Sequence, residues 1–194
     1  MTLRIGVLAL QGAFAEHETV LKRLDVESRE VRLPKDLDGL DGLIIPGGES
    51  TTMGKLAVQY GLMEPLRAFA RSGKPVWGTC AGMIFMAKDA DRDQPLLGLM
   101  DIRVKRNAFG RQIDSFETEL EVQSLEGARP FHAVFIRAPL VESAGPGVDV
   151  LAQVNRNGGR AIVAAKQGNL LATSFHPELS ADDRFHRLFL KMAR

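Results

Sequence analysis

This chain has little cysteine, few large aromatic residues and almost no excess charge. Its 194 residues include one cysteine, one tryptophan and one tyrosine. A single cysteine cannot form an internal disulfide, which is typical of a protein of the reducing cytosol. The formal net charge is +1, and no block of basic residues is present. This balance argues against a nucleic-acid partner and favours a small, weakly charged substrate.

Long apolar runs are also missing. No stretch approaches the ~20 residues that span a bilayer, and the first residues lead straight into a strand-like segment without the layout of a signal peptide. We therefore expect a cytoplasmic protein with no membrane contact. The four histidines are dispersed, and no tight ligand pair accompanies the cysteine. We accordingly expect no metal site.

The first half of the chain alternates strand-like and helix-like segments. The predicted strands are 3–10, 26–33, 43–46 and 76–77, and the predicted helices are 13–24, 50–60, 63–71 and 83–88. Strands that alternate with amphipathic helices indicate right-handed crossovers and a parallel sheet.

The second half follows a different pattern. Its predicted strands, without helices between them, are 102–106, 116–122, 133–136, 161–165 and 170–175. Asn157-Gly158-Gly159 and Gly168-Asn169 mark tight turns, and residues 184–192 form a closing helix. We predict one α/β domain over residues 1–194, with helices on both sides of a mixed, mainly parallel central sheet and an antiparallel-rich second half.

The cysteine lies in Gly78-Thr79-Cys80-Ala81-Gly82, directly after an apolar run. Glycines at i−2 and i+2 are typical of a nucleophile elbow, a sharp strand-to-helix turn in which side chains at those positions would clash. The elbow predicts an exposed sulfur above the sheet edge, with helix N–H groups favouring its thiolate. The alternative is a buried cysteine that acts as a small hydrophobe.

A histidine and a carboxylate follow the last predicted strand, in Ser174-Phe175-His176-Pro177-Glu178. In extended chain, i and i+2 side chains share a face, so Glu178 can orient one imidazole nitrogen while the other faces a nucleophile. The alternative is a surface histidine before a proline turn. We treat His17, His132 and His186 as structural or solvent-facing.

Pro46-Gly47-Gly48-Glu49-Ser50 also follows a buried strand. Successive glycines allow a turn whose N–H groups bind an anion, which makes this segment a candidate oxyanion hole. The alternative is the start of a helix, with Ser50 as N-cap and Glu49 favoured by the helix dipole. A Walker phosphate loop is excluded by the spacing to Lys55 and by Leu56 in place of Ser or Thr.

Together these segments resemble the class I, triad-type glutamine amidotransferases, whose Cys-His-Glu triad matches Cys80, His176 and Glu178 in chain order. Within that class the chain resembles the glutaminase subunits of pyridoxal 5′-phosphate synthase. The motifs that carry this resemblance are Leu10-Gln11-Gly12-Ala13, Pro46 to Met53, Gly78 to Met83, Arg106 to Gln112 with Ser115-Phe116-Glu117, and Phe135 to Pro139. One departure is Ala108, where the family pattern has Ser.

The resemblance implies a flavodoxin-like fold and hydrolysis of L-glutamine to glutamate and ammonia, without a cofactor. It implies that Cys80 attacks the carboxamide, that His176 moves the proton and that Glu178 holds the ring. The oxyanion would be bound by N–H groups near Gly48 and Ala81. The implied substrate-binding residues are Gly48, Glu49, Ser50, Arg106, Ile136 and Arg137.

The resemblance also implies a partner. Ammonia would pass to a (β/α)₈-barrel synthase subunit that builds the vitamin B6 cofactor from a pentose phosphate and a triose phosphate, within a lyase-type complex. Residues 11–17 and the mouth of the site would form part of the docking face. The alternatives are the glutaminase subunit of another synthase, such as imidazole glycerol phosphate synthase, a catalytically silent module on the same fold, and a cysteine-dependent hydrolase or stress protein.

Overall fold

The computed structural model describes residues 2–106, 115–156 and 159–194. The helices are α1 (Phe14–Arg23), α2 (Ser50–Gln59), α3 (Met63–Arg71), α4 (Ala81–Met86) and α5 (Arg184–Met192), with 3-10 turns η1 (Pro34–Leu37) and η2 (Pro177–Leu179). The strands are β1 (Arg4–Leu8), β2 (Glu27–Val31), β3 (Gly42–Ile45), β4 (Val76–Thr79), β5 (Ala87–Ala90), β6 (Met100–Lys105), β7 (Ser115–Leu120), β8 (Phe131–Ile136), β9 (Leu140–Ala144), β10 (Asp149–Arg156), β11 (Gly159–Gln167) and β12 (Leu170–Thr173).

The central sheet has ten strands in the order β2-β1-β3-β4-β12-β11-β9-β6-β5, with β10 paired to β11. From β2 to β12 every pairing is parallel, whereas β11 pairs antiparallel with β12, β10 and β9. Strands β7 and β8 form a separate antiparallel pair. The predicted change from parallel to antiparallel pairing is therefore confirmed.

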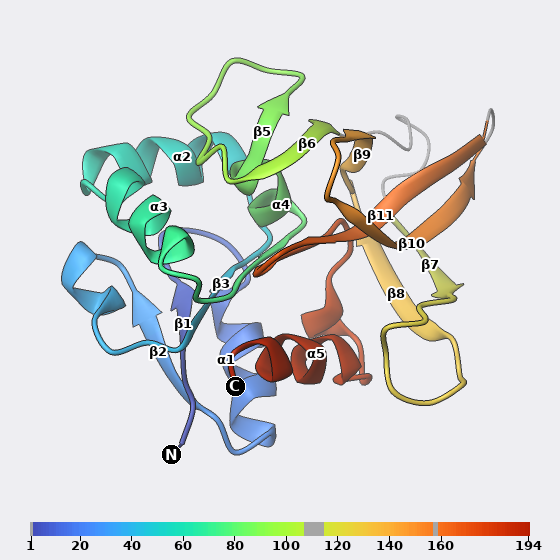
Figure 1. Cartoon of the computed structure of the whole chain (residues 1–194), viewed down its shortest axis with the longest axis horizontal. Helices are drawn as coiled ribbons and strands as arrows, with labels where there is room; N and C mark the ends of the chain where they lie inside the picture. Colours follow the sequence, from blue (N-terminus) through green and yellow to red (C-terminus); the bar gives the residue numbers. More distant parts are fainter. Residues whose placement is uncertain (1, 107–114, 157–158) are drawn as a thin grey trace.

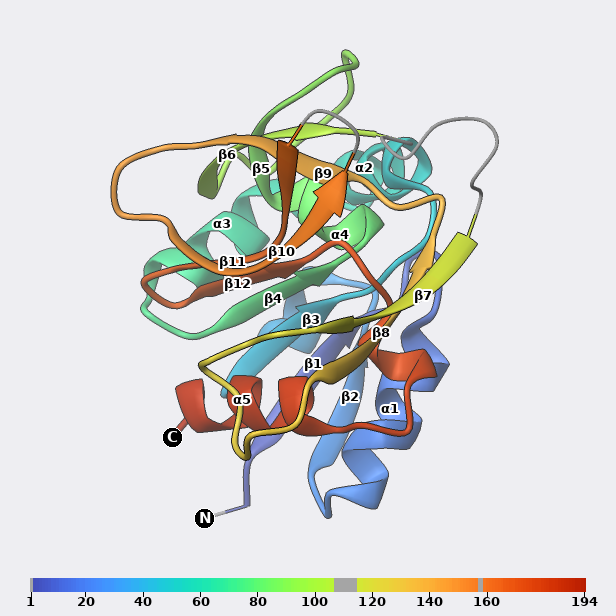
Figure 2. The same cartoon turned by 90° about the vertical axis from the view of Figure 1, so that its right-hand side faces the viewer.

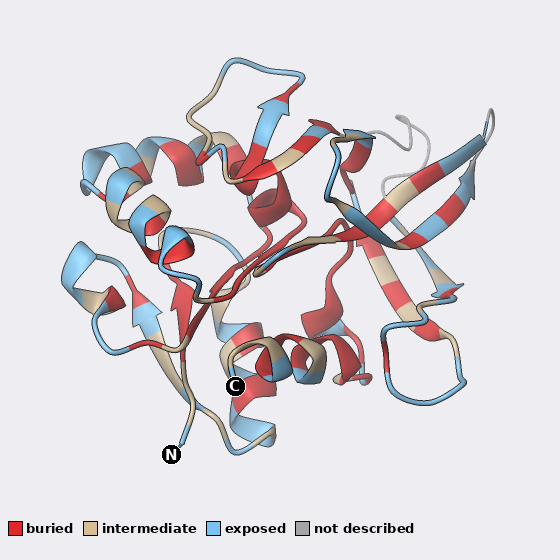
Figure 3. Ribbon diagram, in the orientation of Figure 1, coloured by how far each residue is buried: buried red, intermediate tan, exposed pale blue. Residues whose placement is uncertain are grey.

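Helices cover both faces of the sheet. In Figures 1 and 2, α2, α3 and α4 lie on one side of the sheet and α1 and α5 on the other. Alternate residues of β3 serve the two layers: Leu43 and Ile45 pack in one core cluster and Ile44 in the other, because successive strand side chains point to opposite faces. The innermost strands are buried along their length (Figure 3).

Most predicted segments occur within a few residues of their expected bounds, and α3 and α5 have the expected ones. The predicted helix at 83–88 is wrong at its end, because α4 stops at Met86 and Ala87 begins β5. Strands β5, β9 and β10 were not predicted. A turn does occur at Gly168, whose φ of 57° is in the left-handed region, whereas Asn157 and Gly158 lie outside the described residues.

The helices of the described residues are all too short or too polar to cross a membrane.

Candidate active site

The turn from β4 into α4 places Cys80 at the carboxyl end of a central strand. Cys80 has φ 49° and ψ −106°, a left-handed conformation that costs a residue with a side chain about 1–3 kcal/mol. Its N–H donates to the Thr173 carbonyl of the neighbouring strand, at 2.8 Å. The flanking glycines are required sterically: a Cβ on Gly78 would lie 2.6 Å from the Gly82 carbonyl carbon, and one on Gly82 would lie 1.9 Å from the Ile45 oxygen. The local geometry is that of a nucleophile elbow.

The expected exposure of the sulfur is wrong. Cys80 is buried, with 7% of its surface exposed, and it lines a pocket of about 310 Å³. The glycine loop after β3 covers it, since a Cβ on Gly47 would approach both the Cys80 Cβ, at 3.3 Å, and the His176 ring, at 2.5 Å. The thiol is therefore inside a small pocket, and not on an open sheet edge.

His176 follows β12 and faces the same pocket. Its Nδ1 lies 2.7 Å from Glu178 Oε1, which leaves Nε2 for Cys80. The pairing forms in a way that the sequence pattern does not predict: Pro177 and Glu178 are in the 3-10 turn η2, and not in extended chain. The tight turn folds the carboxylate back onto the ring, where the Glu178 side chain is fully buried.

The electrostatics of the pair favour a charged ring. Burial lowers the pKa of His176, but hydrogen bonds and negative charge from Cys80 and Glu178 outweigh it and raise that pKa to about 10. Burial likewise acts to raise the pKa of Glu178, and the rings of His17 and His176 reverse this, so that its pKa is lowered. At neutral pH the arrangement is an imidazolium that a buried carboxylate holds beside the Cys80 sulfur.

The loop before α2 is fixed by contacts from the segment that precedes α1. The Gly47 carbonyl accepts from Ala13 N–H at 3.0 Å, and Gln11 Oε1 accepts from Glu49 N–H at 2.7 Å. Because a trans peptide places its N–H opposite its carbonyl, the Gly48 N–H points away from Ala13. Gly48 lines the same pocket as Cys80.

Glu49 is the N-cap of helix α2, so the alternative interpretation of this segment names the wrong capping residue in Ser50. Its carboxylate accepts from Thr51 N–H at 3.1 Å and from Thr52 N–H at 2.8 Å. Burial opposes ionisation, but these donors and the Thr52 hydroxyl lower the pKa of Glu49 to about 2. Arg106 also binds Glu49 Oε1, at 3.1 Å. The carboxylate thus accepts from four donors of this chain, and its side chain is still 46% exposed.

The two arginines of the pocket differ. Arg106 donates to Glu49, Thr51 and Gln94, at 3.0 to 3.1 Å, and its side chain is largely buried. Arg137 is exposed and has a strained φ of 43°. Its guanidinium makes no hydrogen bond or ion pair with another side chain in the described part of the chain. Arg137 is therefore the cation available to an incoming anion.

The structure brings nearly all the predicted site residues to one pocket. Its lining includes Cys80, His176, Gly48, Ala81, Glu49, Ser50, Arg106, Ile136 and Arg137. Glu178 is absent from the lining because it lies behind His176. Residues 107–112 of the Arg106 motif lie outside the described part of the chain.

Sequence reasoning missed Gln94 and the role of His17. Gln94, in the loop after β5, accepts hydrogen bonds from Arg106, Ser50 and Thr51, and nothing in its local sequence marks it. His17 is fully buried, with Nε2 at 3.3 Å from Glu178 Oε2, so it cannot form part of a docking face. The sequence signal for the burial of His17 was its position on the apolar stripe of the predicted helix 13–24.

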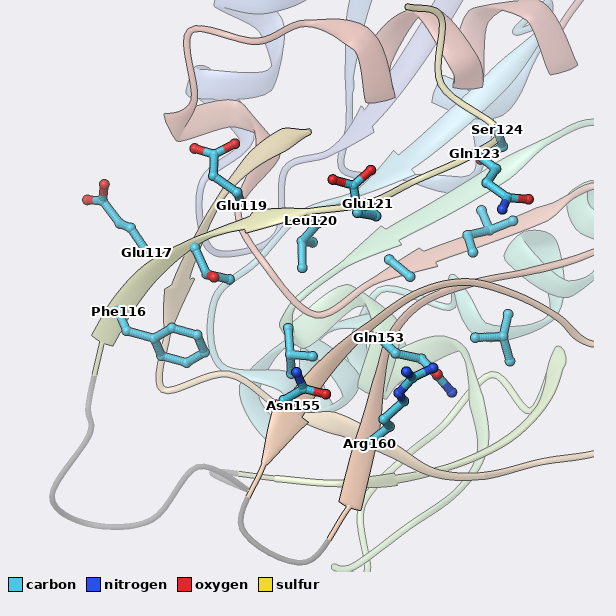
Figure 4. A pocket seen from close by; sticks show the side chains of 15 residues that line it. Phe116, Glu117, Glu119, Leu120, Glu121, Gln123, Ser124, Gln153, Asn155 and Arg160 are labelled. Atoms are coloured by element: carbon cyan, nitrogen blue, oxygen red, sulfur yellow. The ribbon is translucent and has the colours of Figure 1, made fainter. Parts of the chain in front are cut away.

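Among the residues that the structure describes, other polar groups do not form a second site of this kind. His132 is half-exposed and lies between Glu117 and Glu119, at 2.8 Å from each; the side-chain bonds to Glu119 and Glu117 raise the pKa of His132. A larger hollow of about 1570 Å³ lies between β7 and β10 (Figure 4). Its lining contains no cysteine or histidine. Within the described residues, no group of His, Cys, Asp and Glu is arranged to hold a metal ion.

Comparison with known proteins agrees with this geometry. The profile of the SNO glutamine amidotransferase family matches residues 7–194. The protein named Pyridoxal 5′-phosphate synthase subunit PdxT of Herpetosiphon aurantiacus is 59% identical to this chain, over 97% of this chain and 99% of that protein. The protein of the same name from Dehalococcoides mccartyi is 58% identical, over 99% of this chain and 98% of that protein.

A solved structure described as a crystal structure of glutamine amidotransferase superposes with a TM-score of 0.90 at 51% identity, covering 97% of this chain and 98% of that one. A glutamine amidotransferase from Thermotoga maritima shares the fold, with a TM-score of 0.63 at 12% identity over 98% of this chain and 82% of that one. The family match spans the elbow, the glycine loop and the His176–Glu178 pair alike. The chain belongs to the SNO glutamine amidotransferase family.

Proposed function

We propose that this chain hydrolyses L-glutamine to L-glutamate and ammonia, with Cys80, His176 and Glu178 as its catalytic triad. The chain acts as one domain over residues 1–194, as the glutaminase subunit of a pyridoxal 5′-phosphate synthase. The names of its relatives and its family membership support this function. The residue roles rest on the geometry of the pocket.

One observation carries the proposal: a cysteine in a strained elbow shares a small pocket with a histidine whose far nitrogen is held by a buried carboxylate. The His176 Nδ1 to Glu178 Oε1 distance is 2.7 Å. A base oriented by a third group and facing a nucleophile is the arrangement that covalent acyl transfer requires.

Each step has a residue in place. The Cys80 thiolate attacks the carboxamide carbon, and the negative charge that develops on oxygen is bound by the N–H groups of Gly48 and Ala81. One such donor contributes about 3 kcal/mol to the transition state. His176, as imidazolium, gives its Nε2 proton to the leaving nitrogen, and ammonia departs. His176 then takes a proton from water, whose oxygen attacks the thioester, and glutamate is released with regeneration of the thiolate.

The amino-acid end of glutamine faces Glu49, Ser50, Arg106, Ile136 and Arg137. We assign the substrate α-carboxylate to Arg137, because this guanidinium has no other described partner. Arg106 holds Glu49 in place, and the outer side of the Glu49 carboxylate receives the substrate ammonium. Ile136 and Ser50 complete the walls of the pocket.

Ammonia released in water is protonated and lost to synthesis, so a second subunit must capture it. We propose that this partner is a (β/α)₈-barrel synthase and that the complex is cytoplasmic. The partner docks around the mouth of the pocket and contacts the glycine loop, which the Gln11–Ala13 segment already holds in place. Docking stabilises the orientation of the Gly47–Gly48 peptide, so we expect the partner to raise the glutaminase rate.

The test is glutamate release by the purified chain, measured with and without the synthase subunit, for the unaltered protein and for Cys80→Ala. We expect release that rises with the partner and disappears in Cys80→Ala. Glutamate release that survives in the variant would exclude Cys80 as nucleophile. A full rate without the partner would exclude the activation.

A further inference from the structure

Two histidines that the reaction does not use lie directly behind the triad carboxylate. His17 of α1 and His186 of α5 are both fully buried. His17 Nε2 lies 3.3 Å from Glu178 Oε2 and 3.3 Å from Thr79 Oγ1, and His17 Nδ1 lies 3.0 Å from His186 Nε2. The line of contacts from the nucleophile runs from His176 through Glu178 and His17 to His186.

Two buried polar atoms in this line of contacts lack a hydrogen-bond partner in the described part of the chain. Glu178 Oε2 is buried without a hydrogen bond of good geometry among the described residues, and so is His186 Nδ1. A buried carboxylate oxygen without a donor is costly, and His17 Nε2, at 3.3 Å, is a ring nitrogen that can carry a proton toward it. The protonation of two imidazole rings therefore decides whether the triad carboxylate is satisfied.

Only one assignment of protons satisfies the groups. If His17 carries its proton on Nε2, that N–H is shared between Thr79 Oγ1 and Glu178 Oε2, each at 3.3 Å, and the bare Nδ1 accepts from His186 Nε2–H. The orphan His186 Nδ1 is then a lone pair. In the opposite assignment His17 Nε2 can accept from the Thr79 hydroxyl, but its lone pair then faces the carboxylate at 3.3 Å and the N–H of His186 Nδ1 is buried without a partner.

We infer that His17, itself oriented by His186, is a positioning residue that donates through Nε2–H to Glu178 and keeps the triad carboxylate ionised and aimed at His176. This inference rests on the proposed triad and extends it from three residues to five. Neither histidine touches the substrate pocket, since neither is among its lining residues.

Burial supports a neutral pair of rings. Desolvation lowers the pKa of His17, which Glu178 partly offsets and His176 reinforces, and desolvation also lowers the pKa of His186 well below its usual value. The other groups that act on these rings by charge are Glu16 on His17, and His17 and Arg23 on His186. At neutral pH the His17 ring therefore supplies an N–H dipole to Glu178, and not a second positive charge.

The surroundings hold the rings rigidly. Trp77 packs edge-on against both, with ring centroids 5.7 Å from His17 and 4.9 Å from His186, and its Nε1–H donates to Thr173 at 3.2 Å. Trp77 and Thr173 belong to the two strands that end in Cys80 and His176. The same aromatic cluster thus fixes the elbow, the base and the histidine pair.

A matched pair of variants separates hydrogen bonding from packing. His17→Gln keeps an amide N–H near the position of Nε2, whereas His17→Met has a similar length and no donor. With the synthase subunit present, we expect His17→Met to lower kcat/KM about 10- to 100-fold. The acid limb of its pH profile of kcat/KM should move to higher pH, because Glu178 protonates more easily. His17→Gln should stay within a few-fold and keep the original pH profile.

The direct readout needs no variant and no activity. In protein labelled with ¹⁵N-histidine, imidazole correlation spectra should show His17 and His186 neutral and protonated on Nε2 at pH 7. Protonation of His17 on Nδ1 would overturn the inference, as would equal losses and unchanged pH profiles in His17→Met and His17→Gln. Failure of the unaltered chain to release glutamate would instead contradict the proposed function, and the tautomers would still be measurable.

Discussion

The two walls of the pocket are built in different ways. The catalytic wall, formed by Cys80 and His176 with Glu178 behind His176, is almost entirely buried and is fixed by backbone geometry at the ends of β4 and β12. The recognition wall, formed by Glu49, Arg106 and Arg137, is more open: side-chain contacts hold Glu49 and Arg106, whereas Arg137 is exposed. One wall is rigid before glutamine arrives, and the other is polar and able to exchange partners.

This difference separates the two tasks of the site. Reacting groups must be held within a fraction of an ångström, which buried contacts between neighbouring strands achieve. Recognition of a charged amino acid needs charged groups that water can reach until the substrate replaces it. Damage to the catalytic wall should therefore lower kcat, and damage to the recognition wall should raise KM.

The largest effect should come from the nucleophile itself. Cys80→Ala removes the thiolate and leaves the pocket otherwise intact, so we expect glutamate release to fall by about 10⁴-fold or more, in line with loss of a triad nucleophile. Release is measured by coupled glutamate oxidation with the synthase subunit present. A loss of less than about tenfold would show that the catalytic wall does not carry the chemistry.

The next effect should come from the carboxylate. Glu178→Gln retains the shape but removes the charge that stabilises the His176 imidazolium, and we expect kcat to fall about 10²- to 10⁴-fold with little change in KM. Steady-state kinetics at several glutamine concentrations give the two constants. A change confined to KM would mean that Glu178 belongs to recognition.

The recognition wall should respond differently. Arg137→Gln removes a cation that has no described partner, and loss of one charge-assisted hydrogen bond predicts a KM for glutamine about 10- to 100-fold higher at nearly constant kcat. Arg103→Gln is the matched control, because Arg103 is an exposed arginine paired with Glu142 outside the pocket. Equal effects of the two variants would contradict the assignment of Arg137.

The smallest effect concerns stability against pH. The folded pKa of His176 is raised to about 10, so its stabilising contribution is full below the unfolded value of about 6.5 and is lost as the pH rises toward 10. The lowered pKa of Glu178 contributes above about pH 4.3 and is lost as the pH falls.

Thermal unfolding of the unaltered chain and of His176→Asn from pH 4 to 10 should therefore differ most between about pH 4.3 and 6.5, by a few degrees. A difference that grew steadily toward pH 10 would reverse the sign of the His176 contribution. Because this comparison is independent of catalysis, it tests the electrostatics of the catalytic wall alone.

The sequence predicts the catalytic wall better than the recognition wall, for a physical reason. Gly78, Cys80 and Gly82 mark a local backbone geometry, and so does the short spacing of His176 and Glu178. Strand order then brings the two segments together. The 3-10 turn at Glu178 and the burial of Cys80 depend on neighbours distant in the chain, so local pattern could not reveal them.

The remaining contacts are long-range and carry little local signal. Gln94 contacts Arg106 from a loop, and nothing in its local sequence marks it. His17 contacts Glu178 from another helix, and its place on the apolar stripe of 13–24 indicates burial but not its partner. Strands β9 and β10 were missed because their alternation is interrupted, with register shifts in β10 and in the pairing of β9 with β6.

Covalent chemistry at the catalytic wall can be observed directly. The chain and its synthase subunit are mixed with glutamine, quenched in acid within the first turnover and digested, and the peptide that contains Cys80 is examined by mass spectrometry. We predict a glutamyl thioester on Cys80 that forms and decays as glutamate appears and that is absent from Cys80→Ala. Glutamate produced at the full rate with no adduct on Cys80 at any time would contradict the triad mechanism.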